Sequence, residues 1–282
     1  MAITLNTNSA AYIALANLRT VQDALQASEK KISTGYTVSD ALDNGAVFGV
    51  AQATRGSIAA NTAVSQELGN FSGLVTVASA AATQISNNLS DIRGVLGHLS
   101  STALDSNSQL QYATQLQSLV ASIDNFIQGA QYGSTNLLSN GTTFNILADH
   151  QNGNNLTIAG TSYNISSPFA QLNTLATQTF ASANLANFAT AAQANAGSIL
   201  TISNSVSTVL NNVGALNRSL NTQLSFNANV RSALNNALGA LVDADLASES
   251  ANLTSLQVKQ SLSTQALSIA NQGPNTLLRL FQ

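Results

Sequence analysis

The sequence contains no cysteine, only two prolines and few charged residues. Without cysteine the chain has no disulfides, thiolate metal ligands or cysteine nucleophile. Asp, Glu, Lys and Arg make up 7% of the 282 residues, against about 25% in an ordinary soluble domain. Because net repulsion between like charges helps to keep proteins monomeric, a surface this poor in charge favours self-association.

Scarce basic and aromatic residues also argue against nucleic acid as a partner. The formal net charge is −3, Trp is absent and nine residues are Lys or Arg, so the chain offers neither a basic surface nor a base-stacking platform. Its start lacks the basic residues and continuous apolar run of a secretory signal peptide. No stretch of about 18 apolar residues is present. We therefore expect no membrane insertion, and any export must use another signal.

Apolar residues alternate at spacings of three and four along three segments, which is typical of the seam of a coiled coil. An unbroken third helix from Ser198 to Leu241 would be about 65 Å long, which favours an elongated protein. The three seams are Phe71, Leu74, Ala78, Ala81, Ile85, Asn88, Ile92, Val95 and Leu99; Gln109, Tyr112, Leu116, Leu119, Ile123, Phe126 and Ala130; and Ile199, Ile202, Val206, Val209, Val213, Leu216 and Leu220, continued by Val230, Leu234, Ala237 and Leu241.

Polar residues interrupt two of these seams, at Asn88, Gln223 and Asn227. Buried polar residues specify register in some coiled coils. Alternatively, these three lie at the edge of the seam and meet water. The sequence leaves both interpretations open.

The two ends carry narrower apolar stripes, so each predicts one amphipathic helix. A lone helix with one stripe has nowhere to bury it, and we expect both ends to become ordered only when they meet each other or another subunit. The N-terminal helix should end near Gly35 and the C-terminal helix near Gly273. The stripes are Leu18, Val21, Leu25 and Ile32, and Leu246, Leu253, Leu256, Leu262 and Ile269.

The middle of the chain differs in character. Short β-prone runs at 144–147 and 156–158 stand between Asn and Gly clusters, which predicts a small hairpin, and helix resumes after Pro168. The predicted fold is therefore mainly α. We expect an elongated antiparallel helical bundle or coiled-coil rod with paired terminal helices and one small β-hairpin in the middle.

Four segments resemble the terminal regions of bacterial flagellin. They are LNTNSAAYIALANLRTVQDALQASEKKISTGYTVSDALDNGA, ISNNLSDIRGVLGHLSS, VDADLASESANL and ALSIANQGPNTLLRLF. In the first of these segments, Tyr36 and Thr37 differ from the residues that are usual in the family. The resemblance implies an inner filament domain from residues 1–44 and 235–282, a helical rod domain from 45–139 and 180–234, and a small outer segment at 140–179. The flagellin would be a minimal form that lacks most of the outer domains.

That resemblance also implies a function and partners. It implies an extracellular filament subunit for swimming motility, secreted unfolded through the flagellar type III pathway. The partners would be further copies of the chain, an export chaperone, and hook-associated and cap proteins. A hook-filament junction protein and a monomeric adhesin or immune ligand are the alternatives. A flagellin should elongate filament seeds, whereas a monomeric binder should not.

No feature of the sequence predicts an enzyme, a cofactor or a metal site. Neither His98 nor His150 has acidic or histidine neighbours at metal-binding spacing, and H-E-x-x-H, G-x-S-x-G and phosphate-binding glycine loops are absent. Asp243, Asp245 and Glu249 are too few to hold Mg²⁺ or Ca²⁺ without other oxygen ligands.

Three groups of residues are the candidate functional positions. We expect subunit packing through Leu18, Leu25, Ile32, Leu253, Leu256 and Leu262. We also expect Asp243 or Asp245 to pair with Arg55, Lys30 or Lys31, within or between subunits, at a joint between the inner and outer parts. In flagellins that activate an innate immune receptor of vertebrates, an Arg pair and a Glu contact that receptor. Asp91, Arg93 and Gly94 occupy those positions here, which predicts weak activation of the receptor.

Overall fold

The computed structural model describes residues 7–101, 104–139, 141–149, 153–166, 169–170 and 185–280, and the side chains among them except those of 185–196 and 273–280. His150 and Pro168, and therefore the predicted start of helix after Pro168, lie outside the described residues. The described chain divides into two compact units. Unit 1 comprises Met1–Ile58 and Ser232–Gln282, and unit 2 comprises Ala59–Arg231.

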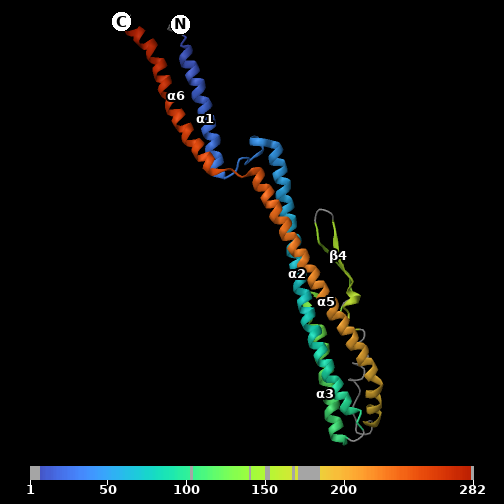
Figure 1. Cartoon of the computed structure of the whole chain (residues 1–282). Coiled ribbons are helices and arrows are strands. Elements are labelled where there is room, and N and C mark those ends of the chain that lie inside the picture. The colour runs from blue at the N-terminus through green and yellow to red at the C-terminus, as the bar shows by residue number, and fades with distance from the viewer. Residues whose placement is uncertain are drawn as a thin grey trace. The chain divides into compact units, whose positions relative to one another are not determined.

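The fold is mainly α, as predicted, with two small hairpins (Figure 1). The predicted hairpin is present as the antiparallel pair β3–β4. A shorter antiparallel pair, β1–β2, precedes it and was not predicted, since two-residue strands leave no alternating pattern. The elements are α1 Ser9–Thr34, α2 Ala41–Leu99, α3 Ser106–Gly129, β1 Gln131–Tyr132, β2 Thr135–Asn136, β3 Phe144–Leu147, β4 Asn155–Ile158, the 3₁₀ turn η1 Gly160–Ser162, α5 Leu185–Val242 and α6 Leu246–Leu280.

Unit 2 has one hydrophobic core, to which α2, α3, α5, the β3–β4 hairpin and residues next to the β1–β2 hairpin contribute. The predicted α5 seam is confirmed, because all seven residues from Ile199 to Leu220 are buried. On α2 the predicted seam was wrong at Ala81 and Asn88, which are half-buried, while Ala82 and Leu89 are buried in their place. The α2 seam is Val64, Leu68, Phe71, Val75, Ala78, Ala82, Ile85, Leu89, Ile92, Leu96 and Leu99, with Leu74 and Val95 buried beside it.

The seams of α3 and of the last part of α5 also differ from the prediction. On α3 the predicted Tyr112, Leu119 and Phe126 only flank the core. The buried residues of α3 are Ala113, Leu116, Val120, Ile123 and Ile127. Near the end of α5, Ala237 and Leu241 are exposed, and Leu238 and Val242 turn inward instead. This stretch belongs to unit 1, where Val242 packs in a separate small core with Val38 and Ala51.

The two polar interruptions of α5 hold the β3–β4 hairpin. Gln223 donates from Nε2 to the Ala148 carbonyl at 3.0 Å, and Asn227 donates from Nδ2 to the same oxygen at 3.3 Å. Gln223 also donates to the Asn227 carboxamide oxygen at 3.3 Å, and Asn227 is 1% exposed. Buried polar atoms are costly unless they are hydrogen-bonded. Both residues therefore anchor the end of β3 on α5, a role that neither interpretation of the sequence anticipates.

Candidate functional site: the terminal helix pair and its junction

The terminal helices α1 and α6 lie side by side and antiparallel (Figure 1). Asn8 donates from Nδ2 to the Ala270 carbonyl at 2.8 Å, and Ser28 Oγ donates to the Glu249 carbonyl at 3.5 Å. The facing residues alternate by three and four on both helices. On α1 they are Ala11, Ala14, Leu18, Val21, Leu25, Ser28 and Ile32, and on α6 they are Glu249, Leu253, Leu256, Gln260, Ser263, Leu267 and Ala270.

This seam is only partly buried. Among its residues, Ser28 and Leu256 are buried at 2% and 7% exposure, and the others are half-buried. Four of the fourteen seam positions are polar. Because stabilisation scales with the apolar area removed from water, the pair gains less from its seam than unit 2 gains from its core.

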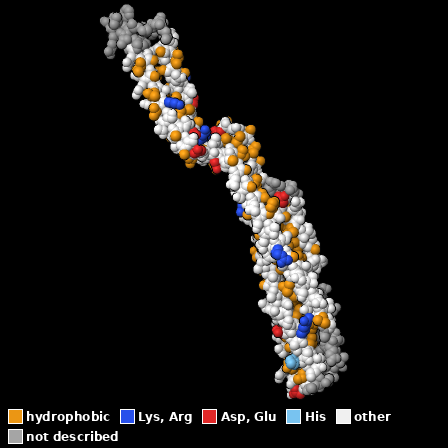
Figure 2. Space-filling model, viewed as in Figure 1, with side chains coloured by type: hydrophobic (Ala, Val, Ile, Leu, Met, Phe, Trp, Pro, Cys, Tyr) orange, Lys and Arg blue, Asp and Glu red, His pale blue; other side chains and the backbone are white. Residues whose placement is uncertain are grey.

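Apolar side chains also stand on the outer face of the pair. Leu262 was predicted on the same stripe as Leu253 and Leu256, but the structure places it on another face, because Gln260 and Ser263 continue the seam instead. Leu262 is 58% exposed. Figure 2 shows apolar side chains scattered over this part of the molecule. The exposed large apolar residues of α1 and α6 are Tyr12, Ile13, Leu246, Val258, Leu262 and Ile269.

The junction, defined as residues 30–44 and 239–249, connects the terminal pair to α2 and α5 within unit 1. Gly35 ends α1 in the left-handed conformation, with φ of 74°, which a glycine adopts without steric cost. The chain then pairs with the turn between α5 and α6. Thr37 N donates to the Val242 carbonyl at 2.7 Å, and Ala244 N donates to the Gly35 carbonyl at 2.9 Å. The two turns are thus fixed to each other by backbone hydrogen bonds.

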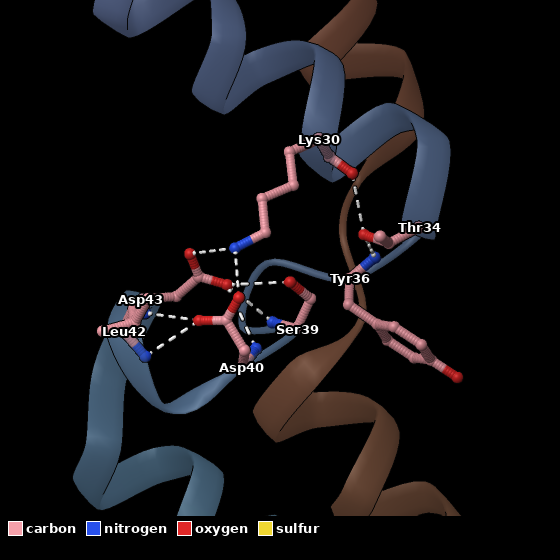
Figure 3. A network of polar contacts seen from close by, with 7 residues as sticks. All are labelled: Lys30, Thr34, Tyr36, Ser39, Asp40, Leu42 and Asp43. Atoms are coloured by element: carbon pink, nitrogen blue, oxygen red, sulfur yellow. Dashed lines mark hydrogen bonds and ion pairs between the residues drawn. The ribbon is translucent and has the colours of Figure 1, made fainter.

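One lysine holds the turn between α1 and α2. The Nζ atom of Lys30 lies 2.7 Å from Asp40 Oδ2 and 2.7 Å from Asp43 Oδ1 (Figure 3). Asp43 Oδ2 also accepts hydrogen bonds from the backbone and side chain of Ser39, each at 2.9 Å. Asp40 Oδ1 accepts from Leu42 N at 2.8 Å and from Asp43 N at 3.1 Å. The turn is therefore closed by a lysine bridge and by two carboxylates that cap backbone amides.

These contacts lower the pKa values of Asp40 and Asp43 and raise the pKa of Lys30. The hydrogen bond from Lys30 is the main cause that lowers the pKa of Asp43 far below its usual range, with further lowering by Ser39. Lys30 likewise lowers the pKa of Asp40. The two carboxylates in turn raise the pKa of Lys30. All three groups stay charged across the physiological pH range.

Helix α2 begins a second time just after this bridge. Asn44 has φ of −161° and ψ of 101°, which interrupts the helix. Its Oδ1 atom accepts from Ala46 N and Val47 N, each at 3.2 Å. A side-chain oxygen in this position is an N-cap. The helix therefore starts again at Asn44.

The acidic stretch at 243–249 begins α6. Asp245 Oδ1 accepts from Ala247 N at 3.0 Å and from Ser248 N at 3.2 Å, so Asp245 is the N-cap. Glu249 lies 4.0 Å from Lys31 Nζ. Asp243 is exposed, and its carboxylate lies over Gly239, where an added Cβ would be 2.7 Å from Oδ2.

The predicted pairing of Asp243 or Asp245 with a cation is not present within the described part of one chain. Lys30 and Lys31 pair with other acids. Arg55 instead places its guanidinium 5.8 Å from the centre of the Tyr36 ring, a cation–π contact. Asp40 and Asp43 were not among the predicted positions, although an Asp followed three residues later by a second acid is the signal of an N-cap and its capping box.

The remaining candidate positions lie on unit 2. Asp91, Arg93 and Gly94 are exposed on α2, and the His98 ring stacks on Tyr112 with centroids 4.8 Å apart. Within the described residues, no three His, Cys, Asp or Glu side chains gather as a metal site requires. The same residues include no helix long and apolar enough to cross a bilayer.

Replacing Lys30 with Met should make the junction sensitive to acid. A lowered carboxyl pKa stabilises the folded state above the unfolded pKa, near 3.9, and this contribution is lost as the pH falls. Without Lys30 the pKa values of Asp40 and Asp43 should rise, so assembled subunits should dissociate at higher pH than the wild type. Light scattering during acid titration measures this midpoint.

Lys31→Met is the matched control for that substitution. It removes the same charge one residue away, but its partner Glu249 lies 4.0 Å from Nζ rather than 2.7 Å. The shift in acid midpoint should therefore be smaller for Lys31→Met. Equal midpoints for the Lys30→Met variant and the wild type would contradict the role of the lysine bridge.

Comparison with known proteins is consistent with this architecture. Residues 5–143 match the bacterial flagellin N-terminal helical region, and residues 196–281 match the bacterial flagellin C-terminal helical region. A flagellin of Brucella melitensis is 31% identical over 289 residues, covering 98% of each chain. Flagellin FljK of Caulobacter vibrioides is 31% identical over 278 residues, covering 99% of this chain and 98% of the relative.

A third relative, flagellin C of Rhizobium meliloti, is 27% identical over 322 residues, covering 98% of both chains. The chain covers nearly the whole length of each of these relatives, so the similarity is not confined to one end. The matches at both ends include the paired terminal helices, the junction and the long helices of unit 2. The chain therefore belongs to the bacterial flagellin family, and it is a minimal form of this extracellular filament subunit.

Proposed function

We propose that this flagellin completes its terminal helix pair only when it polymerises. The observation that supports the proposal is the contrast between the partly polar, half-buried seam of α1 and α6 and the apolar side chains exposed on the outer face. Full burial of one Leu contributes about 1.5–3 kcal/mol. In the filament, neighbouring subunits would bury the apolar side chains that stay exposed on α1 and α6 of a single chain.

In this proposal each unit has its own place in the filament. The terminal helices and the junction form the inner domain, with limits near residues 44 and 235. The α2, α3 and α5 bundle, with limits near 45–139 and 180–234, forms the helical rod, and residues 140–179 form the small outer segment. Packing would use Leu18, Leu25, Ile32, Leu253 and Leu256 in the seam and Leu262 on the outer face.

The proposed partners would bind the exposed apolar side chains of α1 and α6. A helix pair that is poorly stabilised alone is easily kept unfolded, as secretion through the flagellar type III pathway requires. An export chaperone would cover the apolar residues of α6 before secretion. Cap and hook-associated proteins would bind the terminal helices of the subunits at the two ends of the filament.

The substitution Leu262→Asn should weaken polymerisation without destabilising the monomer. Leu262 is 58% exposed in one chain, so the monomer loses little, whereas the filament loses the burial of one leucine. Because part of Leu262 is already covered, a loss of about 1–2 kcal/mol is expected, which raises the critical concentration roughly 5- to 30-fold. Sedimentation after seeding measures this concentration.

Leu200→Asn provides the matched control, because Leu200 is 55% exposed on α5 in unit 2. It should polymerise nearly as the wild type does. If Leu262→Asn polymerised normally, the outer face of α6 would not be a packing surface.

Asp243 is the acid at the junction that we propose to pair between subunits. Asp245 already caps α6, whereas the Asp243 carboxylate is exposed. A cation of a neighbouring subunit, such as Arg55, would then meet Asp243. Ion pairs are screened by salt, so Asp243→Ala should lower filament stability at low salt and have little effect at high salt.

Asp245→Ala distinguishes an ion pair from a helix cap. Loss of an N-cap costs about 0.5–2 kcal/mol and should act equally at low and high salt. Thermal dissociation of filaments at two salt concentrations measures both effects. Asp243→Ala filaments with unchanged stability at every salt concentration would rule out the pairing.

We also propose that this flagellin activates the vertebrate innate receptor weakly. Asp91 reverses the charge of one contact position, and Gly94 removes the side chain of another; only Arg93 is kept. Each change should cost about 1–3 kcal/mol if the contact is buried. A receptor reporter assay tests this, with Asp91→Arg and Gly94→Glu expected to raise activity. Full potency of the unchanged protein would contradict the prediction.

A further inference from the structure

A pocket on unit 2 has aromatic walls. It has a volume of about 240 Å³ and lies where α2 meets the β1–β2 hairpin and β3. The rings of Phe71 and Phe144 line it with centroids 5.8 Å apart, and Tyr132 lines another side. A Cβ at Gly73 would lie 3.1 Å from the Tyr132 ring, so the glycine allows this ring to lie close against α2.

A single carboxylate, that of Glu67, lies at the rim of the pocket. Glu67 precedes Phe71 and Leu74 by four and seven residues, so all three share one face of α2. Its side chain is exposed, and in the described part of the chain no ion pair or hydrogen bond engages it. A carboxylate that becomes covered without a partner is costly, so an occupant that covers Glu67 has to supply a hydrogen-bond donor, and a cationic donor does so most strongly.

Arginine has the chemistry that this pocket fits. Its long aliphatic stem packs on apolar surface, and its planar guanidinium stacks on aromatic rings and forms paired hydrogen bonds with a carboxylate. A lysine lacks the planar group. Aromatic walls beside one acidic group therefore point to an arginine side chain.

Arg218 is the arginine best placed to enter a pocket on another molecule. It lies two residues after Leu216 and two before Leu220, both buried seam residues, so it points directly away from the bundle. It is exposed, and no described side chain pairs with it. Arg93, by contrast, directly follows the buried Ile92, so it flanks the seam and does not point directly away from the bundle.

The pocket and Arg218 are different surfaces of the same chain. A contact between them is therefore heterologous: each copy uses its pocket for one neighbour and its arginine for another, as an open helical polymer requires. We propose that the pocket around Glu67 receives the side chain of Arg218 from a second copy of this chain. The proposal rests on the filament function and assigns one contact between outer units to it.

A charge exchange tests the contact. Glu67→Arg and Arg218→Glu should each raise the critical concentration for seeded polymerisation, by about tenfold. The double variant Glu67→Arg/Arg218→Glu should return it close to the wild-type value, because the pair is restored in reverse. Circular dichroism of each monomer checks its helix content, and Glu67→Gln, a neutral variant of similar shape, should show a smaller rise.

Glu67→Arg/Arg93→Glu separates this pairing from an effect of net charge. It has the same net charge as the wild type and as the first double variant, but it should remain as defective as Glu67→Arg alone. Rescue by Arg93→Glu would overturn the assignment to Arg218, and normal polymerisation of both single variants would overturn the pocket contact. If the wild type did not elongate seeds, the filament function itself would fail instead.

Discussion

The seam between α1 and α6 is half-buried and partly polar, and the proposed coupling of folding to assembly depends on it. Ser28, Glu249, Gln260 and Ser263 occupy positions where a coiled coil normally places apolar residues. Unit 2 has the opposite character, because its core is continuous from Val64 to Leu220. A flagellin has to be unfolded for secretion and rigid after assembly. We propose that dividing the chain into an apolar bundle and a more polar terminal pair satisfies both requirements.

The chain has few charged residues, and several of those at the junction contact one another or cap helices. Figure 2 shows isolated charged side chains on most of the visible surface, whereas Lys30, Asp40 and Asp43 form a connected group. Asp40, Asp43 and Asp245 accept backbone amide hydrogen bonds, and Asp40 and Asp43 also pair with Lys30. At the turn between α1 and α2, the helix start and the ion pairs thus use the same two carboxylates.

How well the sequence predicted each helix depended on how many registers its apolar residues allow. The α5 seam from Ile199 to Leu220 allows one register and was predicted correctly. On α2, apolar neighbours such as Leu74 and Val75 allow two registers, and packing against several elements decides between them. The pairing of Lys30 was not predictable, because it depends on the backbone of the turn. The caps Asp40, Asn44 and Asp245 were within reach of sequence reasoning, since their signal is local.

Hydrogen exchange of the α1 and α6 amides, compared between the monomer and the filament, tests the central claim most directly. Coupled folding and assembly predicts rapid exchange along both helices in the monomer, while the α2 and α5 amides of unit 2 are protected. In the filament, both terminal helices should become as protected as unit 2. Strong protection of α1 and α6 in the monomer, unchanged on assembly, would contradict the claim.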